Sequence, residues 1–147
     1  MEKENSILNG NLSFPLYACS KEIIKRYKKK LDRLDLTYTQ YLTMQVLWER
    51  GNINVKELGL YLYLDSGTLT PLLKKLENKK YIKRDRSSKD ERNLVISLTE
   101  KGKELKKETS HITEEVENSI KGLTKEDKKA LNNLLNKMTT EFNKDEE

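Results

Sequence analysis

Two short amphipathic stretches joined by a tight turn constrain the fold of this 147-residue chain more than any other feature. Val55–Leu62 is patterned as a short helix, and residues 65–68 follow it with a helix-capping carboxylate and a turn glycine. Pro71 lies in the next apolar stretch, and a proline is tolerated only in the first turn of a helix. A second helix is therefore expected to begin near residues 66–68 and to reach Asn78. Two such helices predict a helix-turn-helix.

A basic hairpin follows the second helix directly. Residues 81–86 and 93–98 favour two strands, because apolar side chains alternate along the second of them. The polar residues 87–92 between them form a loop of hairpin length. A basic hairpin in this position is a wing. The predicted fold class is therefore mainly α with a small β-hairpin, and the winged helix-turn-helix is expected to span residues 37–98.

Two helices are predicted before the helix-turn-helix. Apolar side chains at three- and four-residue spacing predict the first over residues 12–34, with Pro15 near its start. Thr37 is expected to cap the second, which covers residues 38–50.

Two more helices are predicted after the wing. One long helix is expected between Thr99 and Gly122, and a last helix begins after Thr124. The apolar stripes of the outer helices need a partner, and the simplest partner is a second copy of the chain. Segments 1–36 and 99–147 are therefore expected to form the dimerisation region of a homodimer.

Composition narrows the class of protein. Only 35% of the residues are hydrophobic, and no stretch approaches the ~18–20 consecutive apolar residues of a membrane span. The first ten residues lack the apolar core of a signal peptide, so we expect a cytoplasmic protein without a membrane partner. A single Cys19 and a single His111 exclude an intrachain disulfide and a Cys/His zinc site within one chain. Neither a cofactor nor enzymatic activity is expected, since no nucleophile lies near His111 in the sequence.

The net charge of +5 is unevenly distributed along the chain. Between Ser66 and Lys103 there are eleven Lys or Arg and five Asp or Glu, a balance of +6, so the remaining residues sum to −1. A basic central segment between nearly neutral ends indicates a surface that binds a polyanion. The alternative is a lysine-rich face that is only solvated. Beside a helix-turn-helix and a wing, double-stranded DNA is the polyanion that we expect.

Two groups of side chains are candidates for contact with DNA. The outward face of the second helix of the helix-turn-helix carries Ser66, Thr68, Thr70, Lys74 and Lys75. Short hydroxyl side chains near a helix N-terminus can approach base edges closely in a major groove. The wing contributes Arg84, Arg86, Lys89, Asp90 and Arg92. An arginine at a hairpin tip can reach a narrow minor groove, and a nearby carboxylate can orient it. A solvated helix face and a solvated turn are the alternatives.

A family resemblance rests on three stretches of sequence. They are LDSGTLTPLLKKLE at 64–77, DERN at 90–93 with ISLT at 96–99, and LTY with QYL within 36–42. The chain resembles the peroxide-sensing branch of the MarR family, the OhrR-like regulators, over about residues 12–102. The resemblance implies a homodimeric repressor in the oxidative stress response, bound to a pseudo-palindromic operator. It places the helix Ser66–Asn78 in the major groove and the wing with Arg92 in the minor groove.

One position departs from the family pattern. In the OhrR-like sensors that this chain resembles, the corresponding segment reads Leu-Cys-Phe. Its cysteine thiolate reacts with organic peroxides and is oriented by two tyrosines. Here Ser13 stands in place of that cysteine, whereas the matching Tyr27 and Tyr38 are present, and so is Tyr17. An alcohol neither ionises near neutral pH nor oxidises as a thiolate does.

Three explanations of Ser13 follow. It is an engineered substitution that locks the reduced, DNA-binding form, or the chain is a natural relative that has lost peroxide sensing, or Cys19 has taken over. Six residues of helix turn through about 600°, so Cys19 points roughly 120° away from Ser13 and the same tyrosines do not suit both. We therefore expect Cys19 to be a small buried apolar residue. The alternative to a sensing role for Tyr27 and Tyr38 is an ordinary role in the core or at an interface.

Two alternative functions stay open at this point. One is a MarR-type regulator that responds to a small aromatic or amphipathic ligand, bound in a cleft between the first helix and the winged unit. The other is a winged-helix module that binds proteins. The basic wing and the hydroxyl-bearing helix argue against the second of these.

Overall fold

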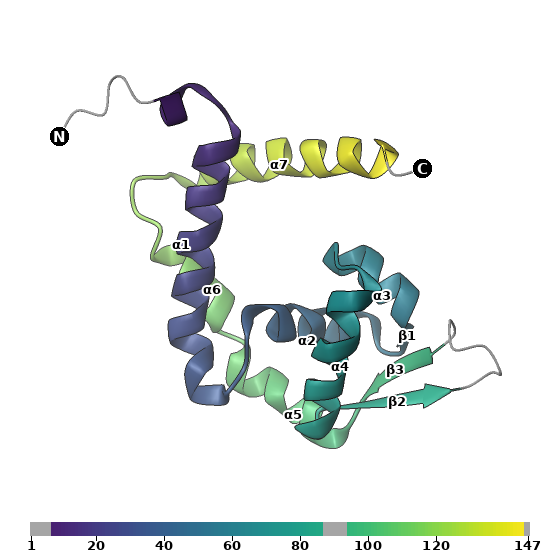
Figure 1. Cartoon of the computed structure of the whole chain (residues 1–147). Coiled ribbons are helices and arrows are strands. Elements are labelled where there is room, and N and C mark those ends of the chain that lie inside the picture. The colour runs from purple at the N-terminus through teal and green to yellow at the C-terminus, as the bar shows by residue number, and fades with distance from the viewer. Residues whose placement is uncertain (1–6, 87–93, 146–147) are drawn as a thin grey trace. The chain divides into compact units, whose positions relative to one another are not determined.

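In the computed structural model, which describes residues 7–86 and 94–145, the predicted helix-turn-helix consists of α3 (Val55–Leu62) and α4 (Ser66–Asn78). α2 (Tyr38–Arg50) precedes it and packs against both of these helices (Figure 1). All three helices have the bounds that the sequence predicts. The mostly helical chain with its small sheet confirms the predicted fold class.

Side-chain caps fix where these three helices begin. Thr37, Asn54 and Asp65 each accept a hydrogen bond from the backbone N–H three residues further along the chain. At the start of α2 the side chain of Gln40 also accepts from the backbone N–H of Thr37, which completes a capping box. The short polar side chains in the sequence therefore determine the helix boundaries.

Pro71 lies deeper in α4 than the sequence argument allows. It is the sixth residue of the helix, in its second turn, so the expectation of a first-turn proline is wrong although the predicted start is right. The Asp65 cap sets the start instead. Proline lacks an N–H, so the carbonyl of Gly67 loses its helical partner. Both residues are exposed, and water can reach that carbonyl.

The sheet has three antiparallel strands in the order β1-β3-β2. β2 (Ile82–Arg86) and β3 (Leu94–Leu98) form the predicted hairpin, and each begins one residue later than predicted. β1 (Ile53–Asn54) was not predicted, because two residues are too short to show an alternating pattern. Its Ile53 pairs with Ile96 of β3, which ties the segment before α3 to the wing.

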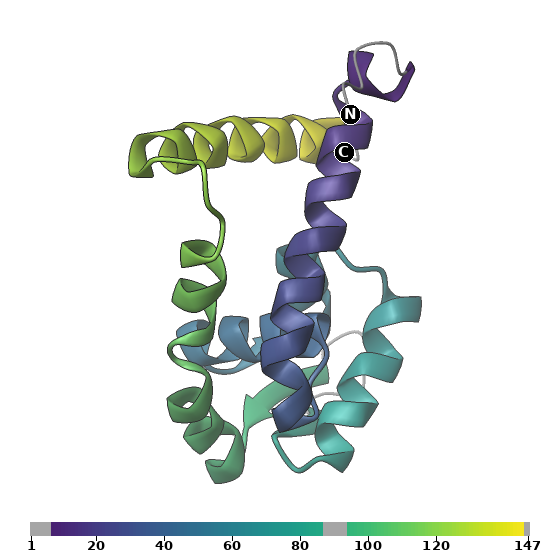
Figure 2. The same cartoon turned by 90° about the vertical axis from the view of Figure 1, so that its left-hand side faces the viewer.

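α1 (Ser13–Leu31) lies between two short 3₁₀ helices, η1 (Ile7–Gly10) and η2 (Asp32–Leu34). The predicted helix over residues 12–34 is thus correct in place, with its last turn tightened. Its buried residues, Tyr27 and Leu31, both lie in the C-terminal half. The N-terminal half of α1 extends away from α2, α3 and α4 in both views (Figures 1 and 2).

The core lies where α2, α3 and α4 meet the sheet. Its fully buried side chains are almost all aliphatic: Met44 and Leu47 of α2, Leu58 of α3, Leu69, Leu73 and Leu76 of α4, and Ile82 and Ile96 of the sheet. Each such side chain stabilises the fold by about 1.5–3 kcal/mol relative to an exposed one. This core is complete within one chain.

The helix after the wing is not continuous, which corrects the prediction of a single long helix up to Gly122. Instead, α5 (Glu100–Thr109) and α6 (Ile112–Asn118) are separated by Ser110 and His111. The hydroxyl of Thr109 donates to the carbonyl of Leu105, and the hydroxyl of Ser110 donates to that of Lys107. Such local bonds to the backbone compete with the regular helical pattern and favour a break.

A glycine lets α5 approach the hairpin closely. A Cβ added at Gly102 would lie 2.1 Å from the carbonyl oxygen of Tyr81, so no other residue fits there without a backbone shift. The carbonyl of Gly102 also accepts a hydrogen bond of 2.9 Å from the indole of Trp48. Thr99 caps α5 as predicted, accepting from the N–H of Gly102.

The chain divides into two compact units, Met1–Thr113 and Glu114–Glu147. The second contains α7 (Lys125–Asp145), whose start is fixed by reciprocal bonds between Thr124 and Asp127. α7 contains no buried residue, although it is amphipathic. Within the described part of the chain, no helix is both long and apolar enough to cross a membrane.

Candidate nucleic-acid interface

The turn between α3 and α4 is built by its backbone. Tyr63 adopts a left-handed conformation with φ 53°, and the N–H of Leu64 donates to the carbonyl of Gly59 at 3.1 Å. A Cβ added at Gly59 would lie 3.0 Å from the carbonyl oxygen of Leu64, so any other residue there would push the turn outward by a few tenths of an ångström. Asp65 then accepts from the N–H of Thr68 at 2.8 Å and starts α4. These contacts set the residue at which α4 begins after α3.

α4 has one buried and one exposed face. The buried face consists of Leu69, Leu72, Leu73 and Leu76. The exposed face includes all five predicted candidates: Ser66, Thr68, Thr70, Lys74 and Lys75. The hydroxyls lie toward the N-terminus of the helix, where the positive end of the helix dipole favours phosphate. The face is therefore accessible and suited to DNA, and the contacts of single residues with DNA stay predictions.

The tip of the wing falls outside the described residues. Lys89, Asp90 and Arg92 are therefore not located, and their predicted roles rest on the sequence alone. The backbone of Arg86 ends β2 opposite Leu94, so the two strands lead directly into the tip.

Arg84 does not extend freely from the wing. One of its terminal nitrogens donates to a carboxylate oxygen of Glu77 in α4 at 2.9 Å, and its side chain is only 22% exposed. This hydrogen bond holds the pKa of Glu77 below its ordinary value. The alternation along β2 is the signal that could have found the pair, because it places Arg84 on the same strand face as the buried Ile82.

The expected sensing residues do not come together within one chain. Tyr27 and Tyr38 do meet, with ring centroids 4.6 Å apart, and Tyr41 lies 5.9 Å from Tyr27. Burial raises the pKa of Tyr38, and negative charge on either neighbouring tyrosine raises it further, so its phenol is protonated at neutral pH. Ser13 is exposed at the other end of α1. At 1.5 Å per residue, it lies about 21 Å along the helix from Tyr27.

Cys19 is exposed, which corrects the expectation that it is buried. Tyr17 is exposed as well, at 58%. Both lie in the N-terminal half of α1, where no side chain before Tyr27 is buried, and helical periodicity alone does not show this.

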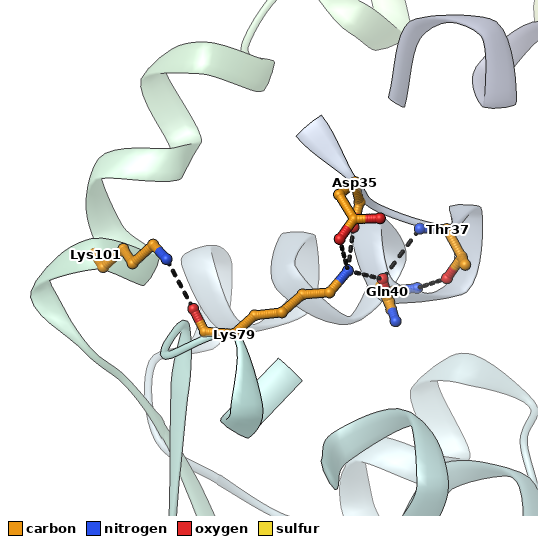
Figure 3. Close-up of polar contacts among 5 residues, drawn as sticks. All are labelled: Asp35, Thr37, Gln40, Lys79 and Lys101. Atoms are coloured by element: carbon orange, nitrogen blue, oxygen red, sulfur yellow. Dashed lines mark hydrogen bonds and ion pairs between the residues drawn. The ribbon is translucent and has the colours of Figure 1, made fainter. Parts of the chain in front are cut away.

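A polar cluster that sequence reasoning missed joins α4 to the start of α2 (Figure 3). The ammonium group of Lys79, the C-cap residue directly after α4, lies against Asp35 and Gln40. The T-x-x-Q pattern at 37–40 signals the capping box. Lys79 lies about forty residues further along the chain, and only the fold reveals that it joins the box.

A protein-family model described as Transcriptional regulator SarA/Rot matches residues 24–109. The chain belongs to the SarA/Rot family. The HTH-type transcriptional regulator SarZ of Staphylococcus aureus is 47% identical over 142 residues, which cover 97% of this chain and 96% of SarZ. The relatives found are thus transcriptional regulators rather than enzymes, and SarZ matches this chain over nearly its whole length.

Solved structures of DNA-binding regulators are also similar to this chain. AbfR of Staphylococcus epidermidis is 31% identical, with a TM-score of 0.76 over 93% of this chain and 94% of AbfR. Reduced AbfR bound to DNA is also similar, with a TM-score of 0.74, 32% identity, and coverage of 90% of this chain and 92% of that one. A MarR-family regulator from Silicibacter pomeroyi is 20% identical, with a TM-score of 0.69 over 89% of each chain, and shows the shared fold alone.

These findings identify the chain as a DNA-binding transcriptional regulator with the winged-helix fold of the SarA/Rot and MarR-type proteins. The predicted MarR resemblance is confirmed at the level of the fold. Membership in its OhrR-like, peroxide-sensing branch stays a prediction.

Proposed function

We propose that this SarA/Rot-family chain is a homodimeric repressor that places α4 in the major groove of a pseudo-palindromic operator and the wing in the adjacent minor groove. The observation that carries the proposal is the exposed face of α4, which carries hydroxyls near the N-terminus of the helix, whereas the leucines of the other face are buried. The similarity to AbfR, a protein solved on DNA, supports it. Residues 37–98 would then be the winged DNA-binding region.

A second copy completes the outer helices in this proposal. The segments 1–36 and 99–147 expose large apolar side chains in both units: Leu12 at 64%, Ile24 at 42%, Leu134 at 60% and Phe142 at 58%. Such faces favour burial against a partner, and a twofold dimer offers the same faces from both copies. Two winged regions in one dimer would bind half-sites whose centres are about one helical turn, ~10 bp, apart.

The selection of operators from a random library tests this function. Duplexes that the full chain enriches are expected to contain an inverted repeat with that spacing, and sedimentation is expected to give a dimer at micromolar concentration. Enrichment of no sequence, or a stable monomer, would contradict the proposal.

We further propose that the chain keeps the architecture of an OhrR-like sensor without its reactive group. The tyrosine pair of Tyr27 and Tyr38 is assembled, whereas Ser13 lies about 21 Å along α1 from it. Only residue 13 of a second copy can therefore reach the pair. AbfR has been solved in reduced, overoxidized and disulfide forms, which supports a thiol-based ancestry for this architecture.

A pair of variants tests this loss of sensing. In a Cys19→Ser background, Ser13→Cys is expected to make DNA binding sensitive to an organic hydroperoxide, because a thiolate oxidises and an alcohol does not. The unaltered protein is expected to keep its DNA affinity under the same treatment. Gel shifts with and without hydroperoxide measure both.

Two outcomes of that experiment contradict the proposal in different ways. If the unaltered protein releases DNA and Cys19→Ser prevents the release, the exposed Cys19 is itself the sensor. If the Ser13→Cys protein does not respond, the tyrosine pair is not a peroxide site, and a small-ligand regulator becomes the better account.

A further inference from the structure

Lys79 occupies a junction between three helices. It is the C-cap residue directly after α4, and its ammonium group donates to the backbone carbonyl of Asp35 and, at 3.4 Å, to the side-chain oxygen of Gln40 (Figure 3). Its own backbone carbonyl accepts a bond of 2.9 Å from Lys101 in the first turn of α5. One residue therefore connects the end of α4 to the starts of α2 and α5.

The acceptors of this junction differ in how well they are shielded from water. Gln40 is buried at 3% exposure, and the side chain of Lys79 is 26% exposed. The carboxylate of Asp35 also lies 3.4 Å from the ammonium, but it is 95% exposed, and solvent screens that ion pair. The carbonyl of Asp35 and the oxygen of Gln40 are therefore the contacts that hold Lys79 in place.

The same turn of α2 takes part in the aromatic contact with α1. Tyr38 is the first residue of α2 and Gln40 is the third, and the oxygen of Gln40 is fixed by the N–H of Thr37 at 3.1 Å. The ring of Tyr38 lies 4.6 Å from that of Tyr27. A displacement of Tyr38 therefore moves the turn to which Lys79 is bound.

We propose that Lys79 is a positioning residue for DNA recognition, and that with Asp35 and Gln40 it forms a latch between the end of α4 and the first turn of α2. The inference rests on the proposed placement of α4 in the major groove. The N-terminal end of α4 reads bases while its C-terminal end is held by the latch. Release of the latch lets the helix change its angle, which costs base contacts before it costs phosphate contacts.

The test compares Lys79→Met with Lys80→Met in the full chain. Both variants lose one positive charge, at neighbouring positions, but the Lys80 side chain makes none of the latch contacts. The probes are a duplex selected by the unaltered protein and a scrambled duplex of the same composition. Lys79→Met is expected to lose about tenfold in affinity for the selected duplex and less than about twofold for the scrambled one. Lys80→Met is expected to affect both duplexes equally.

The salt dependence separates positioning from direct contact. A positioning role leaves the slope of log affinity against log salt unchanged, whereas loss of a phosphate contact lowers it by about 0.9. A lowered slope for Lys79→Met, or affinities equal to those of Lys80→Met on both duplexes, overturns the latch. If the unaltered protein enriches no sequence at all, the proposed function fails and the latch fails with it. Should Lys79→Met not fold by circular dichroism, Lys79→Gln carries the same comparison.

A double-mutant cycle tests whether the latch connects to the tyrosine pair. Tyr38→Leu removes the ring contact with Tyr27 and is expected to weaken specific binding in the protein with an intact latch. In the Lys79→Met protein the same change is expected to have little further effect, because the route to α4 is already broken. Additive effects of the two substitutions would show that the tyrosines and the latch act independently.

Discussion

The winged region and the N-terminal half of α1 differ in how much of their structure one chain can complete. The leucines of α4 pack into a core whose other members come from α2, α3 and the sheet of the same chain. In α1 no residue before Tyr27 is buried, and Ser13, Tyr17 and Cys19 are exposed. The core of the region proposed to read DNA is thus complete within one chain, whereas the region proposed to sense is the one for which a second copy is proposed.

The largest expected effect tests whether the winged region depends on a core formed within one chain. Leu76 is fully buried in α4, and Leu76→Ala is expected to lower the free energy of unfolding by about 2–5 kcal/mol, because it removes buried surface and leaves a cavity. Chemical denaturation followed by circular dichroism measures the change. Tyr17→Ala, on the exposed half of α1, is the control and is expected to change the stability of the winged region by less than about 0.5 kcal/mol. Equal losses would break the comparison.

The next effect tests whether α7 contributes to the proposed dimer interface. Leu134 is 60% exposed in the single chain, and Leu134→Asp is expected to weaken the dimer by about 1.5–3 kcal/mol per copy, the value of burying a leucine. Sedimentation at several concentrations measures the dissociation constant. Asn136→Asp adds the same charge to the same helix and is the matched control. A dimer unaffected by Leu134→Asp would show that α7 does not form the interface.

The third effect separates the two parts of the proposed DNA surface. Arg92→Ala is expected to weaken DNA binding by about 1–3 kcal/mol and to flatten its salt dependence. Thr70→Ala, on the exposed face of α4, is expected to change sequence preference more than the salt slope, because a hydroxyl contacts bases without neutralising a phosphate. Gel shifts over a salt series distinguish them. An unchanged affinity and slope for Arg92→Ala would remove the wing from the mechanism.

The smallest effect concerns the Glu77–Arg84 pair, which joins α4 to β2. The pKa of Glu77 is lowered in the folded state, so its contribution to stability is complete above its unfolded value of about 4.3 and is lost as the pH falls through the folded value. Glu77→Gln is expected to remove this acid-dependent part. Because Glu77 is 36% exposed, the change is expected to stay below about 1 kcal/mol. Unfolding curves between pH 3 and pH 6 test it, and identical pH dependence in both proteins would contradict the role of the pair.

The sequence predicted best those elements whose signals are local. Thr37 and Asp65 indicate where α2 and α4 begin, because the side chain that caps a helix binds a backbone N–H only three residues further along the chain. The break after α5 was missed, since the sequence around Thr109 and Ser110 does not show that their hydroxyls donate to backbone carbonyls of the preceding turn. The exposed state of Cys19 was missed because helical periodicity gives the direction of a side chain and not what covers it.

What the sequence by itself determined is the winged helix-turn-helix, its bounds to within about a residue, and the polar face of α4. Caps, turn residues and apolar periodicity act over a few positions, and a sequence records them directly. Only the tertiary structure decided that Arg84 binds Glu77 and that Lys79 binds the start of α2. These depend on which distant segments the core brings together, and the pattern of a single segment carries no record of its distant neighbours.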